Sequence, residues 1–127
     1  MPLSIYLVTI SFGINSYTKP AATKAKRRHF KALADPIRLE ILQLLREGEK
    51  CVCEIIPQLK IAQPLVSRHL KVLKDCGLVK DGKDGNRRIY SVADSRIFNV
   101  IDDITPDFMK SLSKIIIEQT IYSSLLN

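Results

Sequence analysis

The sequence predicts a mainly helical domain with a small β-hairpin, arranged as a winged helix-turn-helix. Three observations support this fold class. Residues 62–74 have the periodicity of an amphipathic helix, with one apolar and one basic face. A short helical segment precedes them across a tight turn at 60–62. Two strand-like segments, 78–81 and 87–92, follow them and are separated by a turn that contains glycine.

The helix over 62–74 is the segment around which the rest of the chain is organised. Val66, Leu70 and Leu73 recur at the spacing of one buried face. The opposite face has no acidic residue, and its side chains suit phosphates and base edges, since Arg and Lys can donate to guanine and Gln can pair with adenine. The residues that we expect to contact DNA from this helix are Gln63, Pro64, Ser67, Arg68, Lys71 and Lys74. An ordinary solvated face is the alternative interpretation.

The composition limits the class of protein. The chain has 127 residues, of which 46% are hydrophobic and 26% charged, so it fits one folded domain whose modest core a dimer interface can complete. A net charge of +7 favours a polyanionic partner, nucleic acid before membrane. Tryptophan is absent and aromatic residues are only 6%, so double-stranded DNA is expected rather than a stacked single strand. No catalytic set can be drawn from the sequence, so an enzyme is not expected.

The cysteines and the first residues bear on compartment and domain organisation. Three cysteines, Cys51, Cys53 and Cys76, without an export signal indicate a reducing cytoplasm with thiols available for metal or redox chemistry. The apolar segment 3–12 is too short to span a bilayer, so no membrane partner is expected. We divide the chain into an N-terminal extension, 1–20, and a DNA-binding and dimerisation domain, 21–127. The extension either packs on the domain or its dimer partner, or is a poorly ordered tail.

Two helices are predicted before the cysteines. The first covers 23–33 and carries a run of basic residues that is either solvated or in contact with DNA phosphates. The second begins after Asp35, which can cap it, with Pro36 at its first position, and Gly48 is placed to end it. Its core residues are expected to be Ile37, Ile41, Leu44 and Leu45.

The next segments carry the cysteine pair, Cys51 and Cys53, and a hairpin that we call the wing. Pro57 is tolerated in a helix only if that helix begins near Cys53, which places both thiols at a helix N-terminus, where their pKa is lowered. In the wing, residues 82–86 supply two glycines and an asparagine for positive φ. The basic side chains that we expect to contact DNA from the wing are Lys83, Arg87 and Arg88.

The C-terminal segments are predicted to be helical. Asp94 can cap a helix with Ile97, Phe98, Ile101 and Ile104 on one face, and residues 105–107 start a last helix that reaches about residue 125. That helix has more apolar surface than the edge of a small domain needs, so we expect the dimer interface there. The residues that we expect in this interface are Phe108, Leu112, Ile115, Ile116, Ile117 and Ile121.

Several stretches, in this order, resemble the ArsR/SmtB family. They are FKALADPIR (30–38), CVCE (51–54), QPLVSRHLKVL (63–73), GLV (77–79) and GNRRIY (85–90). The resemblance covers roughly residues 25–125. It implies a metal-responsive transcriptional repressor, a homodimer whose two recognition helices enter successive major grooves of a near-palindromic operator, about 34 Å apart. Inducer binding would release it from the operator. A winged-helix protein that binds DNA without an inducer remains an alternative.

The resemblance also implies a sensor site at Cys51 and Cys53, for arsenite, cadmium, lead or zinc. The pair alone cannot satisfy these ions, because trivalent arsenic takes three thiolates in the resembling repressors and zinc usually takes four ligands. Cys76 or a partner subunit is the candidate for completing the site. A soft-metal or metalloid site, a thiol redox switch and a purely structural pair all stay open.

Two further residues differ from the family's sensing and capping patterns. The family's other sensor site, a His and Asp set on the last helix, is missing here because that helix has no histidine. His69 is therefore interpreted as a structural histidine at the edge of the core. Ala62 stands where the family often has a capping serine, and alanine caps less well by about 1 kcal/mol.

Overall fold

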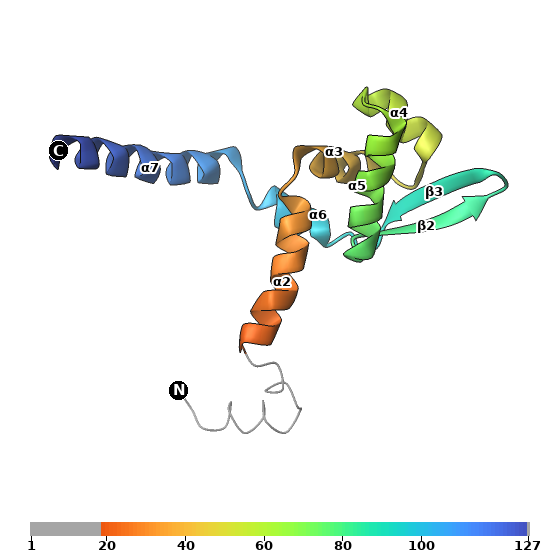
Figure 1. Cartoon of the computed structure of the whole chain (residues 1–127), viewed down its shortest axis with the longest axis horizontal. Coiled ribbons are helices and arrows are strands. Elements are labelled where there is room, and N and C mark those ends of the chain that lie inside the picture. Colours follow the sequence, from red (N-terminus) through yellow and green to blue (C-terminus); the bar gives the residue numbers. More distant parts are fainter. Residues whose placement is uncertain (1–18, 127) are drawn as a thin grey trace, which may run out of the picture. The chain divides into compact units, whose positions relative to one another are not determined.

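The computed structural model describes residues 19–126, which divide after Ala93 into two compact units (Figure 1). The elements of the first unit are α2 (Lys19–Leu33), α3 (Pro36–Leu45), β1 (Lys50–Cys51), α4 (Val52–Leu59), α5 (Gln63–Asp75), β2 (Val79–Asp84) and β3 (Arg87–Val92). The second unit contains α6 (Ile97–Asp102) and α7 (Pro106–Leu126). The predicted extension, 1–20, lies almost entirely outside the described residues.

The start of α3 confirms the predicted cap. Oδ1 of Asp35 accepts hydrogen bonds from the backbone N–H groups of Ile37 (2.9 Å) and Arg38 (3.1 Å), and Pro36 occupies the first helical turn. The predicted end at Gly48 was wrong by three residues. The N–H of Arg46 already bonds to the carbonyl of Gln43, so the last turn tightens and the helix ends at Leu45. Gly48, with φ +133°, lies in the turn toward β1.

The core of the first unit forms where α3 packs against both α4 and α5. The predicted inner face of α5 is confirmed, since Val66, Leu70 and Leu73 are each 0% exposed. On α3 the buried residues are Ile41, Leu42 and Leu45, while Ile37 and Leu44 are half-buried. The prediction missed Leu42 because α3 contacts two helices, which buries a wider arc than one stripe.

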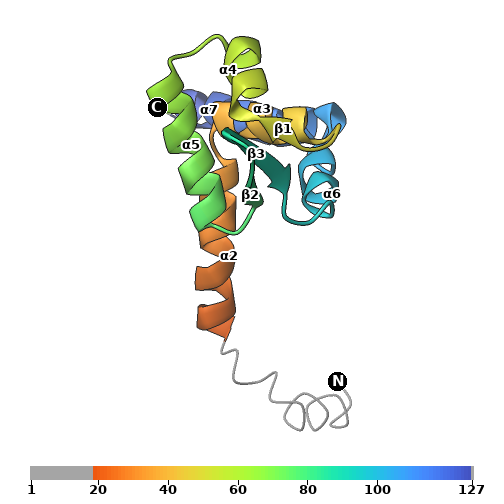
Figure 2. The ribbon, with the colours of Figure 1, turned by 90° about the vertical axis from the view of Figure 1, so that its right-hand side faces the viewer.

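The helix-turn-helix and the wing are visible in Figure 2, where α4 and α5 meet at a short turn. The sheet has the antiparallel order β1-β3-β2, and Cys51 of β1 pairs with Ile89 of β3. The short strand β1 was not predicted. The strand β2 is also longer than predicted, because Gly82 pairs with Ile89 and the turn shrinks to Gly85 and Asn86. Of the three residues expected at positive φ, Gly85 alone has it, at +63°.

The second unit confirms the predicted start of the last helix, where Oγ1 of Thr105 accepts a hydrogen bond from the N–H of Phe108 (3.1 Å) at the start of α7. The predicted cap of α6 was wrong. Oδ1 of Asp94 accepts a hydrogen bond from the N–H of Arg96 (2.9 Å), but Arg96 is itself the N-cap residue, and no side chain caps the helix, which begins at Ile97. In α6, Phe98 is buried and Ile97 and Ile101 are half-buried, while Ile104 lies two residues beyond the end of the helix and is exposed. No residue of α7 is buried. None of the helices within 19–126 combines the length and the apolar character that crossing a bilayer requires.

Candidate nucleic-acid interface

The outer face of α5 carries the six side chains that the sequence predicted to contact DNA. Gln63, Pro64, Ser67, Arg68, Lys71 and Lys74 are all exposed. The helix can present them because Val66, His69, Leu70 and Leu73 fill its opposite face and fix its rotation about its own axis. Its N-terminus lacks a side-chain cap, since Ala62 has no acceptor.

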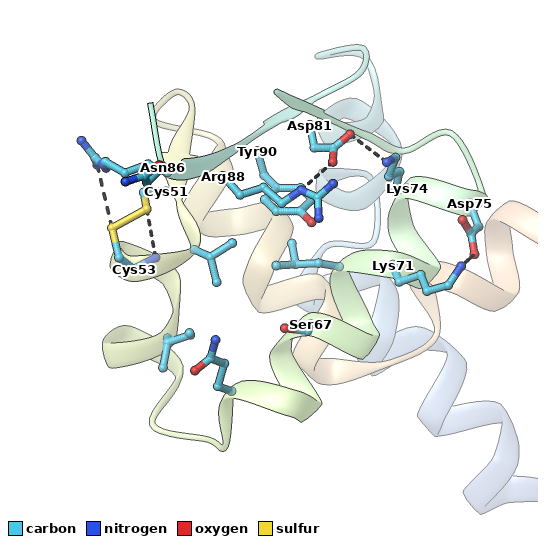
Figure 3. Close-up of a pocket in the computed structure, with 15 residues that line it drawn as sticks. Cys51, Cys53, Ser67, Lys71, Lys74, Asp75, Asp81, Asn86, Arg88 and Tyr90 are labelled. Carbon is cyan, nitrogen blue, oxygen red and sulfur yellow. Dashed lines mark hydrogen bonds and ion pairs between the residues drawn. A yellow bond between two sulfur atoms is a disulfide. The ribbon is translucent and has the colours of Figure 1, made fainter. Parts of the chain in front are cut away.

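An open groove of about 780 Å³, which we call the basic groove, joins this face to the wing (Figure 3). It brings together residues from three places that the sequence separates. Those from α5 include Gln63, Ser67, Lys71 and Lys74, those from the wing include Asn86, Arg87 and Arg88, and those from the start of α4 and the end of β1 include Cys51 and Cys53. Pro64, Arg68 and Lys83 do not line the groove.

Carboxylates pair with several basic side chains of the groove. Asp75 lies 2.8 Å from Nζ of Lys71, and Asp81 lies 2.9 Å from both Nζ of Lys74 and Nε of Arg88 (Figure 3). The hydrogen bond from Lys74, with the charges of Lys74 and Arg88, lowers the pKa of Asp81 below its ordinary value. The sequence prediction found no acid on this face because Asp75 lies one residue beyond the predicted helix, 62–74, and Asp81 comes from β2.

One residue of the basic run on α2 has a structural partner. Nη2 of Arg28 donates a hydrogen bond to the backbone carbonyl of Asp75, at 2.9 Å. This carbonyl belongs to the last residue of α5, where helix carbonyls lack partners within the helix and attract cations. Arg28 therefore ties α2 to the C-terminal end of α5, a role that neither interpretation of the run had anticipated.

His69 connects the inner side of α5 to the start of α3. Its Nδ1 lies 3.2 Å from Nη1 of Arg38 and 3.8 Å from Oδ1 of Asp35, and the residue is 8% exposed. Burial alone would raise the pKa of Asp35. The hydrogen bond from the Arg38 N–H and the charges of Arg38 and His69 outweigh burial and lower it. These contacts agree with the interpretation of His69 as a structural histidine.

The cysteine pair begins α4. Cys51 is the N-cap: its Sγ accepts a hydrogen bond from the N–H of Cys53 (3.1 Å), while Oε1 of Glu54 accepts one from the N–H of Cys51 (3.1 Å). This is a capping box with sulfur in place of a hydroxyl. The structure joins Cys51 and Cys53 in a disulfide, with the two Cα atoms 5.1 Å apart, and leaves Cys76 as a free thiol.

A complete metal site is not present in one chain over the described residues. No three His, Cys, Asp or Glu side chains gather between residues 19 and 126 in a way that could hold an ion. Cys76 is therefore not brought to the cysteine pair. Residues 1–18 contain no Cys, His, Asp or Glu. When reduced, the pair supplies two thiolates, fewer than the ligands that zinc requires.

Comparison with known proteins decides the family. The family model described as "Bacterial regulatory protein, arsR family" matches residues 35–81. An uncharacterized HTH-type transcriptional regulator of Methanocaldococcus jannaschii is 49% identical over 73 residues, which span 57% of this chain and 82% of the relative. The chain belongs to the ArsR family of transcriptional regulators.

Two further comparisons extend this assignment of the ArsR-family chain. A probable mercury resistance operon repressor of Streptomyces lividans is 45% identical over 74 residues, which cover 58% of this chain and only 59% of the relative. The homodimeric winged helix-turn-helix DNA-binding domain of a possible ArsR-family regulator from Mycobacterium bovis matches with a TM-score of 0.66 and 31% identity, over 75% of this chain and 91% of that one. The predicted fold class, a mainly helical winged helix-turn-helix, is confirmed.

Proposed function

We propose that this ArsR-family protein is a transcriptional repressor that binds a near-palindromic DNA operator as a homodimer. The observation that carries the proposal is the outer face of α5, which is exposed, polar and basic and continues into the wing through the basic groove. Such a helix fits the major groove of B-form DNA, and a basic hairpin beside it can reach the adjacent backbone.

The roles of the side chains follow from their chemistry. Arg68 and Gln63 can read base edges from α5, because guanidinium and amide groups form paired hydrogen bonds with guanine and adenine. Lys71, Lys74 and the wing residues Arg87 and Arg88 are assigned to phosphates. The ion pairs of Lys71, Lys74 and Arg88 with carboxylates are exposed on the lysine and arginine side, so phosphates can replace these carboxylates at small cost. Ser67, Pro64 and Lys83 complete the proposed contact surface.

The last helix supports a dimer. All the residues that the sequence assigned to the interface are exposed on α7 in the single chain, with exposed fractions from 44% for Phe108 to 63% for Ile116. An apolar surface of this kind is expected to be covered in solution. The homodimeric M. bovis domain supports a second copy of the chain as the cover.

The cysteine pair is the proposed inducer site. Thiolates prefer soft metals and metalloids, and the S. lividans relative is named for mercury resistance. We therefore assign a thiophilic ion as the class of inducer, with arsenite, cadmium, lead and zinc as the candidates from the sequence. Because one chain supplies two thiolates, the sites for three-thiolate arsenite and four-ligand zinc would need ligands from outside this chain. The disulfide supports a second candidate, a repressor that responds to thiol oxidation.

The proposal is tested by selecting an operator from random duplex DNA and measuring its affinity by fluorescence anisotropy. We expect an enriched sequence with two half-sites. Arg68→Ala should weaken operator binding by about 1–3 kcal/mol. Lys71→Ala should reduce the slope of log affinity against log salt concentration by about one. Arg96→Ala, an exposed arginine of the second unit that pairs with Asp94, is the control for charge. No enriched sequence, or unchanged affinity in both α5 variants, would contradict the proposal.

The inducer site is tested with the same DNA. Cys51→Ser combined with Cys53→Ser should keep operator binding and lose release by arsenite, cadmium and peroxide. Release by peroxide alone in the wild type would select the redox candidate, and release by the ions alone would select the metal candidate. A double variant that still responds fully would remove the cysteine pair from the mechanism.

A further inference from the structure

A wing arginine lies against the start of α4. Nη2 of Arg87 is 3.3 Å from Oε1 of Glu54 and 3.9 Å from Sγ of Cys53. Arg87 is the first residue of β3, so this contact crosses from the tip of the wing to the helix that carries the cysteine pair. Arg87 and Glu54 are 33 positions apart in the sequence.

The oxygen that receives Arg87 is already part of the capping box. Oε1 of Glu54 accepts the backbone N–H of Cys51 as well as the guanidinium of Arg87. One carboxylate oxygen therefore joins the N-cap of α4 to the wing. A change in the backbone at Cys51 must alter the geometry at this oxygen.

A second connection runs through the sheet. Cys51 is the last residue of β1 and pairs with Ile89 of β3, while Lys50 pairs with Tyr90. Cys51 is buried, at 3% exposed, whereas Cys53 is exposed. A ligand that holds both sulfurs must therefore pull on a residue that is fixed in the sheet and in the helix cap at once.

We propose that Glu54 is a positioning residue that couples the chemical state of Cys51 and Cys53 to the wing through Arg87. The proposal rests on the proposed function, since it describes how the sensor site acts on DNA binding. With the capping box intact, Glu54 holds Arg87 and the wing in place. The structure shows these contacts with the two sulfurs joined directly in a disulfide. An arsenic atom that bridges the two sulfurs holds them farther apart than a direct bond does, so the N-cap changes, Glu54 no longer holds Arg87, and the wing loosens. DNA binding then carries the entropy cost of ordering the wing.

The probe for the test is phenylarsine oxide, because it needs only the two thiols that one chain supplies. Each cysteine S–H loses its proton, two arsenic–sulfur bonds form, the arsenic–oxygen bond breaks and one water leaves. Arsenic stays trivalent, so no oxidant or reductant is consumed. The protein carries Cys76→Ser so that the pair holds the only thiols, and it is first reduced with a phosphine and desalted. Mass spectrometry of the intact chain then counts the adducts.

Glu54→Gln separates the proposed role from simple capping. The amide oxygen of glutamine still accepts the N–H of Cys51, but the neutral side chain no longer attracts the guanidinium of Arg87. The matched control is Glu47→Gln, which removes the same charge from an exposed glutamate whose ion pair is with Lys50, at 3.4 Å. Arg87→Gln should reproduce the effect of Glu54→Gln from the other side of the ion pair.

The first measurement is hydrogen exchange of the wing amides in 84–92 without DNA. In the protein with natural Glu54 and in Glu47→Gln, the adduct should speed exchange by about three-fold or more. In Glu54→Gln and Arg87→Gln, exchange should be fast before the adduct forms. It should not become faster with the adduct, because the substitution and the adduct both act by removing the Glu54–Arg87 ion pair. An equal rise in all four proteins, or no adduct on the reduced pair, would overturn the proposal.

The second measurement is the affinity for the selected operator. The adduct should raise the dissociation constant about ten-fold in the natural sequence and in Glu47→Gln, but less than about three-fold in Glu54→Gln. An undiminished response in Glu54→Gln would overturn the proposal. The two measurements also distinguish a failure of the proposed function from a failure of the role proposed for Glu54. If no operator is found, the proposed function fails, while hydrogen exchange of the wing amides still tests the role of Glu54.

Discussion

Asp81 holds Lys74 in an ion pair of 2.9 Å that links the outer face of α5 to strand β2. The same carboxylate holds Arg88 of β3 at 2.9 Å. Its side chain is 13% exposed, whereas those of Lys74 and Arg88 are 47% and 55% exposed. The two cations therefore reach solvent while their shared anion lies behind them. This arrangement fixes the spacing of α5 and the wing and neutralises part of the basic groove.

Asp81→Asn should make DNA binding tighter and less selective. Lys74 and Arg88 would lose their internal partner and would be free to bind phosphates of any sequence. We expect the slope of log affinity against log salt concentration to steepen by about one, which corresponds to one additional phosphate contact. Affinity for unrelated duplex DNA should rise more than affinity for the operator. Asp84→Asn, which removes the same charge from an exposed residue of the wing, should leave the slope closer to that of the natural protein. Equal slopes in the two variants would contradict the role of Asp81.

The carboxyl group of Asp94 should titrate at an unusually low pH. Hydrogen bonds from the side chain and the N–H of Arg96 lower its pKa from the ordinary 3.8 to about 2. Because the folded pKa is depressed, the stabilisation is present above pH 3.8 and is lost as the pH falls through about 2. A carbon-detected NMR titration should show this, and Arg96→Gln should move the midpoint toward 3.8. A midpoint near the ordinary value in the natural protein would contradict the ion pair.

Ala62→Ser should stabilise α5. The backbone at residue 62 is already extended, at φ −60° and ψ 139°, and no side chain caps the helix. A serine hydroxyl can accept one of the unpaired N–H groups of the first turn, which is worth about 0.5–2 kcal/mol in urea unfolding. Ala62→Val, which adds bulk without an acceptor, is the matched control. A gain in both variants would point to packing and not to capping.

The sequence was most informative for features that depend on the residues of a single helix. The exposed and buried sides of α5 follow from its periodicity, and the cap of α3 follows from Asp35 and Pro36 in succession. It was less informative where two elements meet. The strand β1 has two residues and exists because it pairs with β3, so nothing local marks it. The wing turn was placed correctly, but which glycine takes positive φ depends on the register of the strands.

In the candidate site, too, features of a single element could be predicted and contacts between elements could not. The exposure of the basic residues could be predicted from the periodicity of α5 and from the hairpin pattern. Their partners could not, since Asp81 and Glu54 come from other elements than the arginines with which they pair. The role of Arg28 also depends on where the end of α5 lies in space. In the sequence, Cys51 and Cys53 of the CVCE motif suggested metal ligands, and its glutamate was given no role. In the structure, the glutamate of that motif is a structural link to the wing.

The apolar surface of α7 leads to the last prediction, which concerns the dimer. Phe108, Leu112 and Ile115 lie on one side of the helix and Ile117 and Ile121 on another, by their spacing. No residue of α7 is buried, so these side chains contribute little to the fold of the single chain. Two apolar sides on one exposed helix are more than a monomer in water normally keeps.

Ile117→Asp should therefore separate the subunits without unfolding them. A carboxylate buried in an apolar interface without a partner costs about 3–5 kcal/mol, which raises the dimer dissociation constant by more than about a hundred-fold. Sedimentation velocity should show monomers at micromolar concentration, circular dichroism should be unchanged, and operator affinity should fall because the two half-sites are then bound independently. Ser111→Asp, which places the same charge on the side that Ser111 shares with Glu118, should keep the dimer. If Ile117→Asp also remains dimeric with full operator affinity, the subunits meet through another surface, and α7 needs a different partner.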